Sequence, residues 1–271
     1  MIRDITIGQY YPANSVLHKL DPRVKLFATV IYVIALFSFK GFVGLALVSG
    51  FLYAVIKSSK VPFKFMAKGL KAIIVLIIIT SVFNLLGTHG DVVFWKWGSL
   101  QITDKGIINS VVMTIRLIYL ILGTSLMTLT TTPNQLTNGL ETALAPLNKI
   151  NVPVHSIAMM MSIALRFIPI LIEETDKIMK AQMARGADFE QGNLVQKAKA
   201  MVPLLVPLFV SAFRRAEDLA MAMEARCYNG GEGRTKMKPL KYEKRDRVAY
   251  LLVILFLVLV IVAAALVPFP Q

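Results

Sequence analysis

Five apolar stretches, each close to the length needed to cross a lipid bilayer, constrain this chain more than any other feature. They cover residues 24–39, 41–56, 72–86, 106–130 and 248–267. A hydrocarbon core of about 30 Å takes roughly 17 to 25 helical residues. The first two stretches are short enough to form one re-entrant hairpin, but Lys40-Gly41 offers a tight extracellular turn between two spans. We predict an all-α integral membrane protein with about five transmembrane helices.

The composition supports a membrane protein and excludes several other classes. Hydrophobic residues make up 56% of the chain and charged residues only 17%, whereas about a quarter of a typical soluble protein is charged. The formal charge is +14, but the basic residues flank the apolar stretches, so we expect a lipid bilayer and no nucleic acid as partner. The single Cys227 and the absence of a CxxC motif predict no disulfide and no metal site. The polar start predicts no cleavable signal peptide.

Basic residues are distributed unevenly between the two sides of the predicted membrane. With the N-terminus inside, the cytoplasmic segments hold 26 of the 30 lysines and arginines: four up to Lys25, five from Lys57 to Lys71 and 17 between Thr131 and Arg247. Cytoplasmic loops carry such an excess. We therefore expect a multi-pass membrane protein with a cytoplasmic N-terminus and an extracellular C-terminus.

The chain divides into three predicted segments. Residues 1–130 form an N-terminal membrane domain with four transmembrane helices, residues 131–247 a cytoplasmic domain of long amphipathic helices, and residues 248–271 a C-terminal transmembrane helix. Asp21-Pro22 and Thr103-Asp104 are predicted to begin the first and fourth spans. Alternation within residues 87–105 predicts a short β-hairpin.

Two similar triplets end the two long helices of the cytoplasmic segment. Ala184-Arg185-Gly186 and Ala225-Arg226-Cys227 follow runs that align with each other at an offset of 41 residues. Each arginine finishes a mostly apolar helical stripe. Gly186 is a natural C′ residue, and Gly230-Gly231 is predicted to end the second helix a turn later. A terminal arginine commonly does no more than bind its own helix carbonyls, but two copies also fit a docking device for carboxylates on a partner.

Arg116 is a basic residue inside the predicted fourth span. No aspartate or glutamate lies in any span to pair with it. It could belong to an intramembrane polar site shared with Asn84 and Asn109, or tilting and snorkelling could carry it toward an interface. The lack of acidic residues in the spans argues against a proton-coupled or sodium-coupled carrier.

Catalytic motifs are missing from the sequence. It contains no GxSxG, HExxH, Walker A or paired-carboxylate motif, and the three histidines are too far apart to suggest a ligand set. We therefore predict no catalytic, cofactor-binding or metal residues, so that any ATP is bound by another subunit. The many methionines of residues 159–223 are typical of helix packing, or of a surface that adapts to more than one partner.

Four stretches together resemble one family. They are SVLHKLDPRVKL, TTPNQL, PVHSIAMMMSIALRFIPILIEETDKIMKAQMARGADF and AMEARCY. With them the chain resembles the transmembrane T component of energy-coupling factor (ECF) transporters, which import vitamins and metal ions into bacteria and archaea.

The resemblance implies a coupling scaffold of the bacterial cell membrane, without catalytic activity. Residues 184–186 and 225–227 would dock on two ATP-binding-cassette ATPase subunits, which bind ATP and magnesium, while a separate membrane S component captures the substrate. Cys227 stands where the family often has glycine, which questions the need for glycine there. A membrane anchor or assembly factor that docks peripheral proteins is the alternative reading, and a channel or secondary carrier is a third.

Overall fold

The structure is a computed structural model of the chain, and it describes residues 10–39, 41–88, 93–97, 100–187, 189, 193–230, 237 and 239–266. Packing divides the chain into two compact units. The bundle unit contains residues 8–139 and 240–271, and the helix-pair unit contains residues 1–7 and 140–239. Packing thus groups the last helix with the first four. The predicted segments divide the chain by sequence position alone, and their boundaries at residues 130 and 247 stay a prediction.

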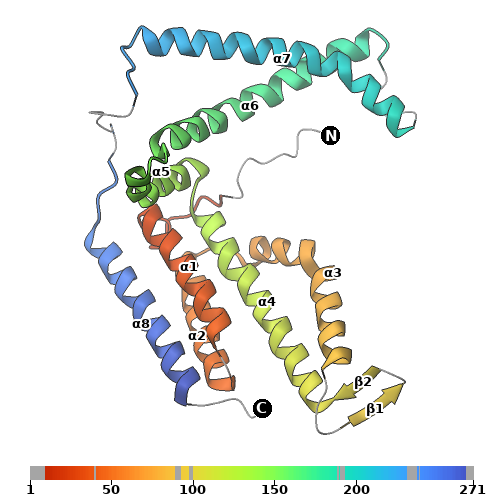
Figure 1. Cartoon of the computed structure of the whole chain (residues 1–271), viewed down its shortest axis with the longest axis vertical. Coiled ribbons are helices and arrows are strands. Elements are labelled where there is room, and N and C mark those ends of the chain that lie inside the picture. The colour runs from red at the N-terminus through yellow and green to blue at the C-terminus, as the bar shows by residue number, and fades with distance from the viewer. Residues whose placement is uncertain are drawn as a thin grey trace. The chain divides into compact units, whose positions relative to one another are not determined.

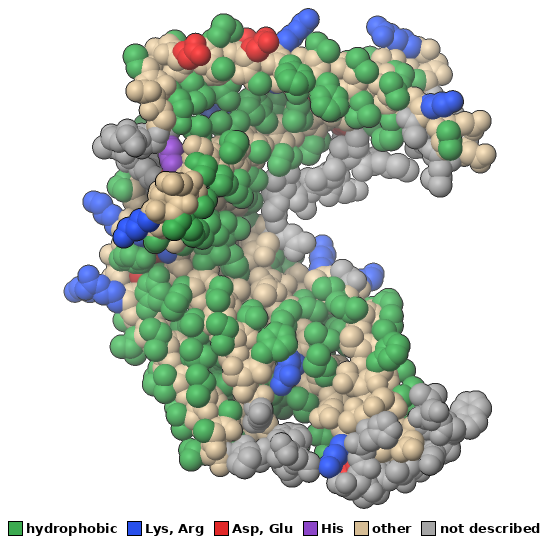
Figure 2. Space-filling model, viewed as in Figure 1, with side chains coloured by type: hydrophobic (Ala, Val, Ile, Leu, Met, Phe, Trp, Pro, Cys, Tyr) green, Lys and Arg blue, Asp and Glu red, His purple; other side chains and the backbone are tan. Residues whose placement is uncertain are grey.

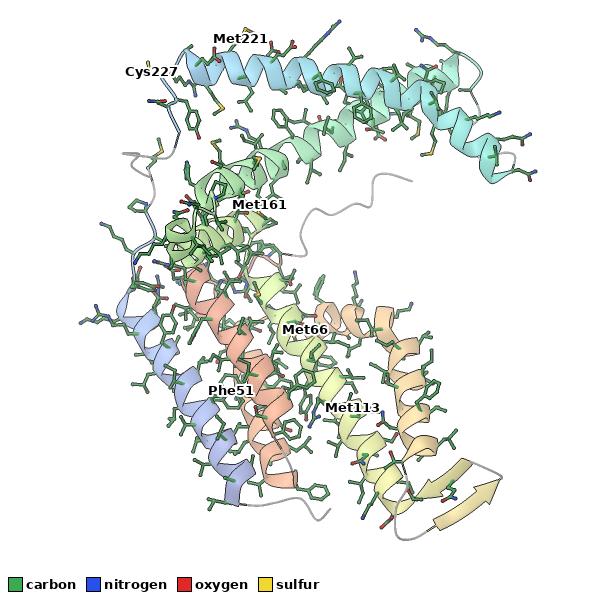
Figure 3. All side chains as sticks on the ribbon, in the orientation of Figure 1. Phe51, Met66, Met113, Met161, Met221 and Cys227 are labelled. Carbon is green, nitrogen blue, oxygen red and sulfur yellow. The ribbon has the colours of Figure 1, made fainter. Side chains whose placement is uncertain are left out.

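Five long helices build the bundle unit: α1 (Pro22–Ser38), α2 (Gly41–Ser59), α3 (Phe63–Gly87), α4 (Asp104–Thr130) and α8 (Lys244–Leu266). Helix α8 packs against α1 and α2, while α4 contacts α1, α2 and α3 (Figure 1). Phe51 of α2, labelled in Figure 3, stacks on Phe256 of α8 with ring centroids 4.0 Å apart. The core of the bundle therefore joins the last helix of the chain to the first two.

Both predicted helix starts and the predicted hairpin are confirmed. The Asp21 side chain accepts a hydrogen bond from the Arg23 backbone N–H, with Pro22 at the first helical position of α1. Thr103 caps α4 by accepting from the Gly106 N–H. Strands β1 (Val93–Trp97) and β2 (Leu100–Thr103) pair antiparallel. Lys40-Gly41 is predicted to form the turn between the first two spans. Lys40 lies outside the described residues, and Gly41 has a φ of 79°.

Several helices have the length and composition to cross a membrane. Among the described residues these are α2, α4, α6 and α8, and α3 would be a fifth if its two parts, bent by 62° between Lys71 and Ile73, form one span. Of their most apolar windows, only 17% is buried in α2 and α8 and 22% in α4. Figure 2 shows hydrophobic side chains along α8 and basic ones near its first turns. Exposed apolar helices of this length need lipid around them, so the fold is that of a multi-pass membrane protein.

The set of candidate spans differs from the prediction at two helices. The prediction includes α1, which has only 17 residues and is about 25 Å long. It leaves out α6 (Val154–Ala184), whose first part is apolar and whose second part carries acidic and basic residues. The prediction includes α1 for its apolar composition, and it leaves out α6 because the basic residues of that segment indicate the cytoplasmic side.

The helix-pair unit contains the two long helices expected after the fourth span. Helix α5 (Pro133–Leu144) begins in the bundle unit and ends in the helix-pair unit, and a 3₁₀ helix over Ala145–Ile150 follows it. Helices α6 and α7 (Leu194–Glu224) each have 31 residues. The prediction of two long helices that end near the repeated arginines is therefore confirmed.

Candidate partner-docking site

The first arginine closes helix α6 in a Schellman motif. Arg185 follows the last helical residue, Ala184, and Gly186 has a φ of +90°. The Gly186 N–H donates to the Met183 carbonyl and the Ala187 N–H to the Gln182 carbonyl, both at 3.0 Å. These two bonds satisfy carbonyls at the helix end that otherwise lack a partner. Gly186 is therefore the C′ residue, as predicted.

The second arginine closes helix α7 with the same backbone geometry. The Cys227 N–H donates to the Glu224 carbonyl at 2.8 Å, and the Tyr228 N–H donates to the Met223 carbonyl at 3.0 Å. Cys227 has a φ of +56°. The helix therefore turns at Cys227, and the prediction that Gly230-Gly231 ends it a turn later is wrong. A side chain with a Cβ can adopt this left-handed conformation, although at a cost of about 1–2 kcal/mol.

All residues of both triplets are exposed. Ala184, Arg185 and Gly186 are exposed, and so are Ala225, Arg226 and Cys227. Figure 3 shows Cys227 at the end of α7. Among the described residues neither guanidinium forms a salt bridge. An exposed guanidinium keeps its planar fork available for a carboxylate on another molecule.

Helices α6 and α7 hold the two tips at opposite ends of an antiparallel pair. A salt bridge joins Glu174 of α6 to Arg215 of α7, and the Gln182 side chain donates to the Pro203 carbonyl at 3.3 Å. The salt-bridge partners are 41 residues apart, the same offset that relates the two arginine triplets. Each arginine therefore follows the crossing residue of its own helix by 11 positions, or about 16 Å of helix. The two tips accordingly lie roughly 30–40 Å apart along the pair.

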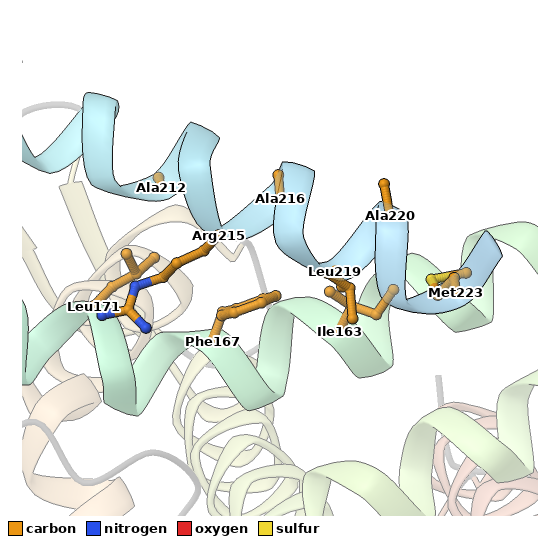
Figure 4. Close-up of a pocket in the computed structure, with 9 residues that line it drawn as sticks. All are labelled: Ile163, Phe167, Leu171, Ala212, Arg215, Ala216, Leu219, Ala220 and Met223. Atoms are coloured by element: carbon orange, nitrogen blue, oxygen red, sulfur yellow. The ribbon is translucent and has the colours of Figure 1, made fainter. Parts of the chain in front are cut away.

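An apolar groove follows the line along which the two helices meet. Figure 4 shows Ile163, Phe167 and Leu171 of α6 opposite side chains of α7. The groove has a volume of about 290 Å³, and the α7 residues that line it are Ala212, Arg215, Ala216, Leu219, Ala220 and Met223. Three of these α7 residues are alanines, whose side chains are small. The helix pair thus meets through the salt bridge and large apolar side chains, with small residues between them.

The salt bridge between the two helices was not predicted, although the sequence holds a signal for it. In the alignment of the two runs, Glu174 stands over Arg215, so that opposite charges occupy equivalent positions. When two equivalent helices cross antiparallel, a residue near the crossing point meets its own counterpart. Opposite charges at one aligned position therefore indicate where the crossing lies.

Arg116 and Asn84, predicted as a possible intramembrane polar site, form hydrogen bonds with different elements. The Arg116 Nη2 donates to the Phe39 carbonyl at the end of α1 at 3.2 Å, and the guanidinium lies 4.7 Å from the centre of the Phe39 ring. The Asn84 amide donates to the Thr80 carbonyl of its own helix at 2.8 Å. Arg116 therefore binds the α1 end of the α1–α2 connection.

The described residues contain few side chains of the kinds that bind metal ions close to one another. Among them no group of three or more His, Cys, Asp or Glu side chains could hold a metal ion. His155 contacts Glu141 with its Nδ1 2.9 Å from a carboxylate oxygen, which makes a pair within the helix-pair unit. This contact joins α5 to α6.

Comparison with known proteins identifies the family. A family model described as "Cobalt transport protein" (CbiQ) matches residues 13–237. The chain belongs to the CbiQ family. The matched range includes both arginine tips and the helix pair that carries them. It also includes the first four helices of the bundle unit.

Relatives within the CbiQ family are similar over nearly their whole length. The chain is 56% identical to a protein of Clostridium kluyveri over 93% of each chain. It is 54% identical to one of Thermosediminibacter oceani over 92% of this chain and 94% of the relative, and 49% identical to one of Bacillus subtilis over 91% and 93%. All three relatives are named energy-coupling factor transporter transmembrane protein EcfT.

Proposed function

We propose that this chain is the transmembrane coupling scaffold of an ATP-driven importer of the energy-coupling factor type. It would link two ATP-binding-cassette ATPase subunits to a substrate-binding membrane S component. The observation that carries the proposal is the pair of exposed arginine tips, built with one backbone geometry and held at opposite ends of an antiparallel helix pair. Two equivalent tips fit two equivalent partner subunits, and the names of the relatives agree with this role.

The proposed chemistry assigns ATP hydrolysis to the partners. ATP and magnesium would be bound by the ATPase subunits, and this chain would hold no cofactor. The membrane would be the bacterial cell membrane, with the N-terminus and the helix pair on the cytoplasmic side and the C-terminus outside, because the basic residues concentrate in the segments placed inside. Arg185 and Arg226 would then face the subunits that use ATP.

The proposed mechanism transmits movement through the helix pair. Closing of the two ATPases around ATP would change the separation of the docked tips. Because each tip continues into a helix of 31 residues, the movement would reach the apolar groove and the faces that hold the S component. A scaffold can couple in this way only if its helices make different contacts in two states.

Arginine substitutions test the proposal. We expect Arg185→Ala or Arg226→Ala to reduce capture of the ATPases and uptake at least tenfold, since breaking a desolvated arginine-carboxylate pair typically costs about 2–5 kcal/mol. Lysine at either position should restore the activity only in part, because it lacks the planar fork. Arg214→Ala, an exposed arginine on α7 away from the tip, is the matched control and should behave as the unaltered chain. The proposal is wrong if the double alanine variant still binds both ATPases and supports full uptake.

The alternative function, a membrane anchor or assembly factor, predicts a different result. Such a protein would bind its partners through the same tips without substrate movement. Vesicles that contain the chain, the ATPases and an S component distinguish the two functions. ATP-dependent uptake supports the scaffold, and binding without uptake supports the anchor.

A further inference from the structure

Within the described residues, the chain passes between the two units at two places. One lies within α5, between Gly139 and Leu140, and the other lies between Pro239 and Leu240, shortly before α8. Force that the helix-pair unit exerts on the bundle unit through the described backbone passes these two connections. The bundle-unit residues next to them therefore decide whether movement is transmitted or absorbed.

The start of α8 is bonded to the start of α1 through one buried carboxylate. Asp246 is 2% exposed. One of its oxygens accepts a hydrogen bond from the Asp21 backbone N–H at 2.9 Å, and the other accepts from the Glu243 N–H at 2.8 Å. Asp21 precedes α1 and Glu243 precedes α8. A single side chain thus satisfies backbone donors at the beginning of both helices. Asp246 and Asp21 are 225 residues apart in the sequence.

The next residues of α1 reach the second connection. Arg23 forms a two-point contact with the Asp21 carboxylate at 3.0 and 2.8 Å, and its guanidinium lies 3.9 Å from the centre of the Tyr242 ring. Burial opposes ionisation of Asp21, but the hydrogen bonds and charge of Arg23 outweigh it and lower the pKa of the carboxyl. Tyr242 follows the connection at Pro239–Leu240 by two residues, so this stacking holds the chain where it enters the bundle unit.

The first connection is held by the same turn of α1. Lys25, which is 7% exposed, donates from Nζ to the Thr130 carbonyl at 2.8 Å, at the end of α4 and just before α5. Gly139 of α5 lies so close to Pro22 that a Cβ at this glycine would be 2.9 Å from the Pro22 Cβ. The backbone of α5 therefore rests directly on the first residue of α1.

We propose that this cluster, which we call the clamp, is the mechanical anchor of the bundle unit in transport. Its members are Asp21, Pro22, Arg23, Lys25, Gly139, Tyr242 and Asp246. The clamp ties both connections to the first turn of α1, so that a displacement of the helix-pair unit moves α1, α4 and α8 together. Without the clamp, the displacement would be absorbed where the chain crosses between the units. This inference rests on the proposed coupling function.

Two variants of Tyr242 test the clamp in the complete complex. Tyr242→Leu removes the ring that lies over Arg23, whereas the matched control Tyr242→Phe keeps the ring and removes only the hydroxyl. The side chain is 48% exposed, so neither change empties a core site. For each variant the measurements are the amount of ATPase that co-purifies, ATP hydrolysis, and substrate uptake per ATP hydrolysed. We expect uptake per ATP to fall about two- to fivefold for leucine and to remain unchanged for phenylalanine.

Asp246→Asn provides a second variant with a larger expected effect. Asparagine can accept only one of the two backbone hydrogen bonds, so we expect uptake per ATP to fall about tenfold. A role in folding alone would lower ATPase capture, hydrolysis and uptake in parallel for all variants, and that result would overturn the proposal. Equal uptake per ATP for Tyr242→Leu and Tyr242→Phe would also overturn it. Failure of the unaltered chain to capture any ATPase would refute the proposed function, and the clamp proposal with it.

Discussion

Replacement of Gly186 by alanine and of Cys227 by glycine should change the two helix ends in opposite directions. The two ends share one hydrogen-bond pattern and a C′ residue with positive φ, +90° at Gly186 and +56° at Cys227. Only the residue type differs. We therefore expect Gly186→Ala to destabilise the end of α6 and Cys227→Gly to stabilise the end of α7.

The expected size follows from the surroundings of each residue. A Cβ added at Gly186 would meet no atom within 4 Å, so alanine introduces neither a clash nor a new contact. What remains is the left-handed backbone, which disfavours a residue with a Cβ by about 1–2 kcal/mol, partly offset by the loss of about 0.4–1 kcal/mol of unfolded-state entropy. The net change is about 0.5–1 kcal/mol, or roughly a two- to fivefold change in the equilibrium of the last turn.

Hydrogen exchange of the purified chain measures this equilibrium. The reporters are the backbone N–H groups of Ala187 and Tyr228, which close the two motifs. We expect exchange at Ala187 to be about two- to fivefold faster in Gly186→Ala, and exchange at Tyr228 to be slower by a similar factor in Cys227→Gly. Cys227→Ala, which keeps the Cβ, is the control and should resemble the unaltered chain. Faster exchange at Tyr228 with glycine at position 227 would refute the backbone explanation.

Three further predictions follow from contacts elsewhere in the two units. Glu174→Arg or Arg215→Glu should each lower uptake about two- to fivefold by breaking the salt bridge, whose side chains are partly exposed, and the double charge exchange should restore most of the loss. Gly123→Ala should destabilise the bundle by about 1–3 kcal/mol in thermal unfolding, because its Cβ would lie 2.2 Å from the Tyr32 ring. Burial, together with the charge of Lys25, lowers the pKa of His18 despite its bond to the Tyr11 carbonyl, so the unfolded chain binds the proton more readily. The stability that neutral His18 contributes is present above its ordinary pKa of 6.5 and should be lost as the pH falls through the lowered value.

A matched variant shows which result would contradict each of these three predictions. If the double charge exchange is as weak as the single variants, the salt bridge does not set the crossing of α6 and α7. Gly50→Ala, also inside a helix, should raise the stability by about 0.4–1 kcal/mol, because a Cβ there meets no atom within 4 Å and alanine favours the helix; an equal loss at both glycines would contradict the close-approach argument. His18→Gln should make unfolding between pH 5 and 7 less dependent on pH, and an unchanged profile would rule out His18 as the cause.

The helices could be predicted from the sequence because their signals are local. The apolar stretches, the proline after Asp21 and the threonine before α4 each act within a few residues, and the structure has helices at all of these places. The two arginine ends were also predicted, because an offset of 41 residues can be read without a structure. The exact turn at Cys227 was not, since glycine is the usual left-handed residue and the next glycines lie three residues later.

The contacts between distant segments could not be predicted in the same way. Asp246 binds the backbone of Asp21 across 225 residues, and nothing in either local sequence selects the other. The partner of Arg116 could not be predicted either, because it is the backbone carbonyl of Phe39. Every residue has such a carbonyl, so the sequence does not indicate which one is bound. Such pairs depend on how the helices pack, which the periodicity of one helix does not determine.

The equal arms of the helix pair restrict which changes of length this chain can accept. Arg185 follows Glu174, and Arg226 follows Arg215, by 11 residues, which is close to three full turns of 3.6 residues. Each arginine therefore returns to nearly the same helical face as the crossing residue of its helix. Insertion of one residue into either arm would rotate that arginine by about 100° and lengthen the arm by about 1.5 Å. The spacing between crossing and tip is thus a constraint on the gene as much as on the fold: substitutions along an arm can accumulate, whereas a single-codon insertion or deletion would turn one of the two arginines away from the carboxylate that it is proposed to bind.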